Sequence, residues 1–76
     1  MTKDTVFEVL NDVFYGDNHY DTVVIYATYQ AIRMVRDSNG QFPAFSLSER
    51  LLSIEYPTRT DYVSLDAITL ISASED

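Results

Sequence analysis

The sequence predicts an α+β domain in which two N-terminal helices pack on a C-terminal antiparallel β-hairpin or three-stranded sheet. Three observations favour this class: apolar residues recur at helical spacing before Gly40, the residue pattern changes there, and apolar and polar residues then alternate. The 76 residues leave room for one domain, 1–76. A chain of this size buries only about 60 % of its unfolded surface, so a partner or a second copy would help to stabilise it.

The first predicted helix runs from Thr2 to Phe14. Thr2 is a suitable N-cap, and Gly16 followed by Asp17-Asn18 supplies a C-terminal stop and a turn. Apolar residues occupy one side of this helix and polar residues the other. The apolar set is Val6, Phe7, Val9, Leu10, Val13 and Phe14, and the polar set is Asp4, Glu8, Asn11 and Asp12.

A second helix is predicted from Thr22 to about Asp37, with Asp21 as its N-cap and Ser38-Asn39-Gly40 as its end. The β-branched run Val23-Val24-Ile25 equally suits a strand, which leaves the N-terminal half of this helix open. The apolar row of the predicted helix is Val23, Ala27, Ala31 and Met34, extended by Val24, Ile32 and Val35.

The second half of the chain carries the predicted strands. Residues 52–56 and 63–72 alternate apolar with polar side chains around a turn at 57–61, and a third strand is expected around Phe42 to Leu47. A rival interpretation remains for residues 47–56, because Ser46-Leu47-Ser48-Glu49 fits a capping box. We prefer the strand to a third helix at that position.

One short segment resembles a known family. Residues 62–72, Tyr-Val-Ser-Leu-Asp-Ala-Ile-Thr-Leu-Ile-Ser, are similar to the closing strands of Sm-like small barrels, as seen in bacterial RNA chaperones and a small acidic inhibitor of transcription termination. The glycine-punctuated first half of the Sm pattern is missing. The resemblance implies an alternative fold, a helix plus a small Sm-like β-barrel, and an alternative function in nucleic-acid binding. It transfers no functional residue.

The charge composition favours a protein partner with a basic surface. Twelve acidic residues against five basic ones give a net charge of −7, which repels nucleic acid and anionic membranes and attracts basic protein surfaces. The absence of cysteine and of a long apolar run favours a soluble, cytoplasmic protein. The alternative is that the acidic residues have no binding role and only keep the protein soluble.

Catalytic and metal-binding motifs find little support in the sequence. His19 is the only histidine, the chain has two glycines, and no phosphate-binding loop or nucleophile elbow is present. The segment beginning at Asp17 fails as a calcium loop, because Thr22 stands where glycine is needed and Thr28 where the bidentate glutamate is needed. We therefore expect no enzymatic activity, no metal and no cofactor.

The first helix carries the most informative polar pattern. Asp4, Glu8 and Asp12 follow one another at i, i+4 spacing without an interleaved basic residue, and each like-charge pair costs about 0.2 to 0.5 kcal/mol. Asp12 also lies near the negative end of the helix dipole. Asp17 and Asp21 continue the negative charge beyond the helix. We expect this surface to meet arginines or to imitate a phosphate backbone; the alternative is a solvated face.

A second candidate surface lies on the predicted second helix. Tyrosine and arginine are typical interface anchors, and four of them fall on one side of this helix. The alternative is that the tyrosines line the edge of the core and that Tyr29 stacks on Arg33. The four residues are Tyr26, Tyr29, Arg33 and Arg36.

These features predict a non-enzymatic protein-binding regulator or inhibitor. The most specific version of this prediction is a phage-type inhibitor that imitates nucleic acid and blocks a host nucleic-acid-handling or defence complex. Its partner would be a basic, nucleic-acid-binding protein, with no direct binding of nucleic acid or membrane. The alternatives are an Sm-like nucleic-acid-binding protein and the structural subunit of a homo-oligomer such as a homodimer.

Overall fold

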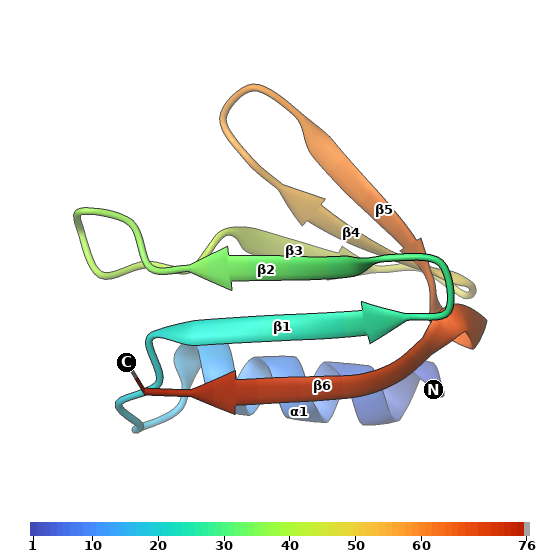
Figure 1. Ribbon diagram of the computed structural model, residues 1–76, viewed down its shortest axis with the longest axis horizontal. Coiled ribbons are helices and arrows are strands. Elements are labelled where there is room, and N and C mark those ends of the chain that lie inside the picture. The colour runs from blue at the N-terminus through green and yellow to red at the C-terminus, as the bar shows by residue number, and fades with distance from the viewer. Residues whose placement is uncertain (76) are drawn as a thin grey trace.

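The computed structural model describes residues 1–75, and there the chain forms one α-helix followed by six β-strands (Figure 1). The α+β class is therefore confirmed, with one helix in place of the two expected. The elements are α1 (Lys3–Tyr15), β1 (Thr22–Ala27), β2 (Ala31–Val35), β3 (Ala44–Leu47), β4 (Leu51–Glu55), β5 (Thr60–Ser64), the short 3-10 helix η1 (Leu65–Ala67) and β6 (Ile68–Ser74).

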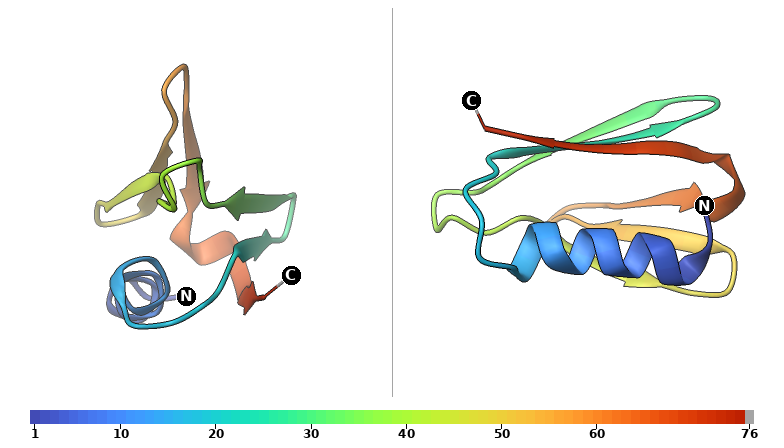
Figure 2. Two further views of the ribbon diagram at one scale, coloured as in Figure 1. Left: turned by 90° about the vertical axis from the view of Figure 1, so that its left-hand side faces the viewer. Right: turned by 90° about the horizontal axis from the view of Figure 1, so that it is seen from below.

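The strands form two antiparallel sheets, with the orders β2-β1-β6 and β3-β4-β5. Seen end-on, α1 lies in the angle between the two sheets, beside β3 on one side and near β1 and β6 on the other (Figure 2). The loop 36–43 and η1 carry the chain from one sheet to the other. Within residues 1–75 the two sheets do not join into a closed barrel, so the Sm-like barrel alternative is wrong.

The predicted first helix is confirmed, together with its ends. The Thr2 hydroxyl accepts a hydrogen bond from the Thr5 amide at 3.2 Å, and the Gly16 amide donates to the Asp12 carbonyl at 2.8 Å. A Cβ atom at Gly16 would overlap that carbonyl oxygen. Glycine is thus needed here for close approach and not for a left-handed conformation, because its φ is −78°.

The predicted second helix is wrong: residues 22–35 form the β1–β2 hairpin. Its turn is Thr28-Tyr29-Gln30, closed by a 2.8 Å hydrogen bond from the Ala27 amide to the Gln30 carbonyl. Burial alternates with period two along β2 and, from Val23 onward, along β1, as in a half-buried sheet. Gly40 does adopt a positive φ of 76°, but in the loop after β2 and not at a helix end.

The strands expected after Gly40 are confirmed in outline, and the helical alternative for residues 47–56 is wrong. The single strand predicted for 63–72 is broken by η1, so β5 pairs with β4 in one sheet and β6 pairs with β1 in the other. The turn between β4 and β5 is closed by a 2.8 Å hydrogen bond from the Tyr56 amide to the Arg59 carbonyl.

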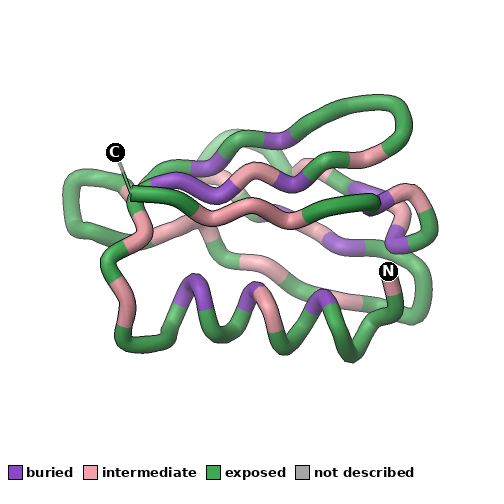
Figure 3. Tube along the Cα trace, turned by 60° about the horizontal axis from the view of Figure 1, so that its bottom comes forward, coloured by how far each residue is buried: buried purple, intermediate pink, exposed green. Residues whose placement is uncertain are grey.

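One apolar core joins α1 to both sheets. Every third or fourth residue of α1 points into it, together with the inward residues of the strands, as the alternating burial in Figure 3 shows. Among the described residues, no helix has the length and apolar character needed to cross a membrane. The buried core residues are Val6, Leu10, Val13, Phe14, Val23, Ile25, Ile32, Met34, Leu52, Ile54, Val63, Leu65 and Ile68.

Candidate functional site

The outer face of α1 carries the row of carboxylates predicted from the sequence, which we call the acidic stripe: Asp4, Glu8 and Asp12. Asp4, Glu8 and Asp12 are all exposed, whereas Val6 and Leu10 on the opposite side are fully buried. The i, i+4 spacing therefore does place the three carboxylates together along one solvent-facing row. Lys3 is the only basic residue of this helix.

Two aromatic side chains flank the acidic stripe. Phe7 is 51 % exposed and Tyr15 is 64 % exposed. From the sequence, Phe7 is predicted to belong to the apolar row, and Tyr15 is assigned no role. A signal was present for Tyr15, because it lies four residues beyond Asn11 and three beyond Asp12, on the polar side of the helix. We call this combined surface the acidic–aromatic face: Asp4, Phe7, Glu8, Asp12 and Tyr15.

A groove of ≈ 420 Å³ lies between α1 and strand β3 and is lined in part by the acidic–aromatic face. The Phe45 ring lies between the two helix aromatics, with its centroid 6.4 Å from that of Phe7 and 6.2 Å from that of Tyr15. The groove wall is therefore aromatic. Its lining residues, which define the α1–β3 groove, are Lys3, Asp4, Phe7, Asn11, Tyr15, Phe45, Ser46 and Leu47.

Asn18 completes the end of α1 nearest Asp12. Its side-chain amide donates to the Asp12 carbonyl at 2.8 Å and to the Val13 carbonyl at 3.2 Å. Its side-chain oxygen accepts from the Tyr20 amide at 3.2 Å. The Asp12 carbonyl also accepts from the Gly16 amide, so the Asn18 side chain is a second donor there and extends the cap to the Val13 carbonyl. The neutral Asn18 amide thus offsets part of the negative charge at this end of α1, where the last turn contains no basic residue.

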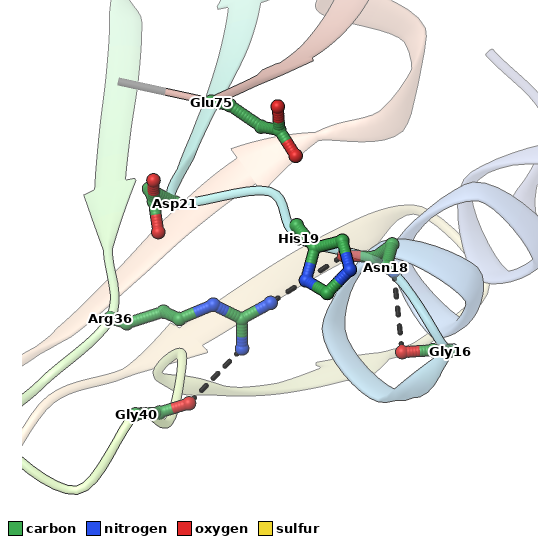
Figure 4. Close-up of a pocket in the computed structure, with 7 residues that line it drawn as sticks. All are labelled: Gly16, Asn18, His19, Asp21, Arg36, Gly40 and Glu75. Carbon is green, nitrogen blue, oxygen red and sulfur yellow. Dashed lines mark hydrogen bonds between the residues drawn. The ribbon is translucent and has the colours of Figure 1, made fainter.

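Arg36, one of the predicted binding residues, is held by internal contacts (Figure 4). Its guanidinium donates to the Tyr20 carbonyl at 2.7 Å and to the Gly40 carbonyl at 3.0 Å. It also lies 4.3 Å from the centroid of the Phe42 ring. Arg36 therefore ties the loop before β1 to the loop after β2, which explains why it is half-buried.

The negative charge continues past α1, as predicted, through exposed Asp17 and Asp21. The fold adds Glu75, because a 2.9 Å hydrogen bond from the Asp21 amide to the Ser74 carbonyl holds the end of β6 beside this segment. Asp21, Glu75, His19 and Arg36 border a hollow of ≈ 520 Å³ (Figure 4). Within residues 1–75, no group of three or more His, Cys, Asp or Glu side chains is placed to hold a metal ion.

The predicted tyrosine and arginine face is not one helical face. Tyr26 on β1 and Arg33 on β2 share the outer surface of the sheet β2-β1-β6, since the register sets Tyr26 opposite Ala31 and Arg33 opposite Val24. Tyr29 lies in the β1–β2 turn, where its hydroxyl accepts a 3.3 Å hydrogen bond from the Ser64 amide. This surface and the acidic–aromatic face lie on different sides of the core.

Two further hollows, of ≈ 420 and ≈ 330 Å³, lie along the free edge of β2. They share Arg33, Tyr56 and Arg59. Arg59 pairs with Asp61 at 3.2 Å and lies over the Tyr56 ring. Burial raises the pKa of the Tyr56 phenol above its ordinary value and Asp61 adds to this, while Arg59 opposes it. The charges of Arg59 and Asp61 therefore partly balance each other.

No protein-family model, curated protein or solved structure matches this chain. The fold and the site define a small α+β domain with one helix whose outer face is both acidic and aromatic. What that face can bind follows from its charges, its exposed rings and the groove beside it.

Proposed function

We propose that this protein is a non-enzymatic regulator or inhibitor that binds a basic surface of a partner protein through the acidic–aromatic face of α1. The observation that carries the proposal is the row of three exposed carboxylates beside two exposed aromatic rings. Charge complementarity steers association and fixes orientation, whereas aromatic side chains supply much of the energy at interfaces. The face contains both kinds of group.

The partner we propose is a nucleic-acid-binding protein, which the stripe engages as a partial imitation of a phosphate backbone. Residues four apart on a helix rise by about 6 Å, whereas one strand of B-DNA carries a phosphate every ~3.4 Å. The stripe thus has about half the linear charge density of a DNA strand. Phe7 and Tyr15 would supply the affinity that the lower charge does not. An inhibitor of phage type, acting in the cytoplasm on a host nucleic-acid-handling or defence complex, fits this chemistry.

Charge reversal on α1 tests the proposal. In Glu8→Lys/Asp12→Lys two stripe carboxylates are reversed; in the matched control Glu55→Lys/Asp66→Lys, two exposed carboxylates of β4 and η1 undergo the same change. Capture from a host extract, with nuclease and at low and high salt, should yield a protein retained by the native chain and the control but lost by the stripe variant. DNA should then displace the purified captured protein. Equal capture by both variants would contradict the proposal.

A second candidate, a homo-oligomer, is favoured by the outer surface of the sheet β2-β1-β6. Tyr26 is 41 % exposed and Leu70, its neighbour in register on β6, is 53 % exposed. Sedimentation at several protein concentrations tests this candidate, since self-association raises the apparent mass with concentration. Direct nucleic-acid binding has less support, because the surface is acidic and the sheets do not form the barrel that suggested it.

A further inference from the structure

Strand β3 has a free edge next to the acidic–aromatic face. It is the outer strand of the sheet β3-β4-β5 and pairs only with β4 among the described residues. An edge strand presents unpaired N–H and C=O groups that can accept another strand. α1 lies beside this edge (Figure 2) and does not pair with it.

The α1–β3 groove opens at this edge. Its β3 lining consists of three consecutive residues, Phe45, Ser46 and Leu47. Because successive side chains of a strand point to opposite faces, three consecutive lining residues are expected where a hollow reaches the strand edge. The groove volume, ≈ 420 Å³, falls within the range of about 300 to 1,000 Å³ that is typical of ligand pockets.

The charges around the groove specify what it would accept. Asp4 lines it, and Glu8 and Asp12 continue from Asp4 along the adjacent helix face. Lys3, at one end, is the only basic residue in the lining. An occupant with apolar side chains between lysines or arginines would match both the aromatic walls and the carboxylates.

We propose that an extended segment of the partner adds to the free edge of β3 as an extra strand. Its groove-facing residues alternate with solvent-facing ones; apolar side chains enter the α1–β3 groove and flanking lysines or arginines reach Asp4 and Glu8. This is strand addition, in which backbone hydrogen bonds give affinity and alternate side chains give specificity. The inference rests on the proposed function and specifies the chemistry of the partner segment.

The probe is an acetylated and amidated heptapeptide, Lys-Thr-Val-Thr-Phe-Thr-Lys. Two further versions carry N-methyl groups on alternate residues, so that each blocks one edge of the strand while the charges and side chains stay the same. A fourth peptide has glutamate in place of both lysines. Binding is followed by NMR titration, together with hydrogen exchange of the β3 amides, Ala44–Leu47.

We expect the parent peptide to bind and to slow exchange in β3, one N-methylated version to lose binding, and the glutamate peptide not to bind. Phe7→Ala should weaken binding about tenfold, as truncation of an interface anchor does. Its matched control, Tyr62→Ala, removes a similarly exposed ring from β5 and should leave binding unchanged. Circular dichroism verifies that both variants remain folded.

The outcomes separate this inference from the proposed function. Failure of the parent peptide to bind, or equal binding by both N-methylated versions, overturns strand addition. If those versions bind equally but lose affinity in Glu8→Lys/Asp12→Lys and at high salt, the acidic surface keeps its proposed role. If the peptide slows exchange of the β3 amides but its affinity is unchanged in Glu8→Lys/Asp12→Lys and at high salt, strand addition is supported. The charge-based function is then contradicted.

Discussion

At the scale of single residues, the structure separates polar groups that hold the fold from those that face outward. Asn18 and Arg36 both bind backbone carbonyls, and Arg36 Nη2 lies 3.5 Å from the Asn18 side-chain oxygen. The chain patterns that suggested a binding role for Arg36 assumed a helix, whereas its partners come from two separate loops. These contacts give two predictions about stability.

Replacing Asn18 with alanine should destabilise the protein by about 1 to 2 kcal/mol, because the amide bonds at the end of α1 are lost and each is worth roughly 0.5 to 1.5 kcal/mol net. Urea unfolding measures the change. Asn11→Ala, at an exposed position within the same helix, is the control and should not destabilise. Equal effects of the two substitutions would mean that Asn18 does not cap the helix.

Arg36→Gln should lower the free energy of unfolding by about 1 to 3 kcal/mol, since the charge-assisted bonds to the Tyr20 and Gly40 carbonyls are lost. Arg33→Gln, on an exposed strand position, should change it by less than about 0.5 kcal/mol. Chemical denaturation of both variants checks this difference. A larger loss at Arg33 would place the structural arginine on β2 instead of in the loop.

At the scale of elements, residues 22–35 show why a helical pattern can describe a hairpin. Val23, Ala27, Ala31 and Met34 follow helical spacing in the sequence, yet the buried apolar residues are Val23, Ile25, Ile32 and Met34. With a three-residue turn between the two strands, Ile32 follows Ile25 by seven residues and Met34 follows Val23 by eleven. These separations are close to two and three turns of a helix. The β-branched residues favour the strand, and pairing with β6 supplies the second neighbour of β1.

The negative charges along α1 lead to a third prediction about stability. Asp12→Lys should stabilise the protein by about 0.5 to 1 kcal/mol, because it replaces a like-charge pair with Glu8 by an attractive one and suits the negative helix end. Thermal unfolding measures the gain, with Asp66→Lys as a control outside α1. The same substitution should weaken partner binding. Intact binding would mean that the stripe is only a solvated face.

At the scale of the whole molecule, the net charge of −7 should make stability depend on salt. Self-repulsion opposes the compact state, and salt screens it. The midpoint of thermal unfolding should therefore rise between about 0.05 and 0.5 M sodium chloride. Glu8→Lys/Asp12→Lys, with less net charge, should show a smaller rise. A midpoint that does not change with salt, or an equal rise in the variant, would contradict charge repulsion as the cause.

The sequence by itself determined α1, its caps and the acidic stripe. A helix is built from hydrogen bonds between residues four apart, and the Thr2 cap reaches only Thr5, so local pattern is sufficient there. It also identified most of the strand regions after Gly40 through their alternation. Tyr15 was missed although its spacing from Asn11 and Asp12 places it on the polar side of the helix.

Only the tertiary structure decided the pairing of β1 with β6, the break at η1, and the groove between α1 and β3. Each depends on residues far apart in the chain, such as Phe7 and Phe45, and their contact follows from how the whole core packs. The acidic stripe could thus be predicted from the sequence alone. The strand edge and the aromatic walls beside it form only when the sheets have packed around α1.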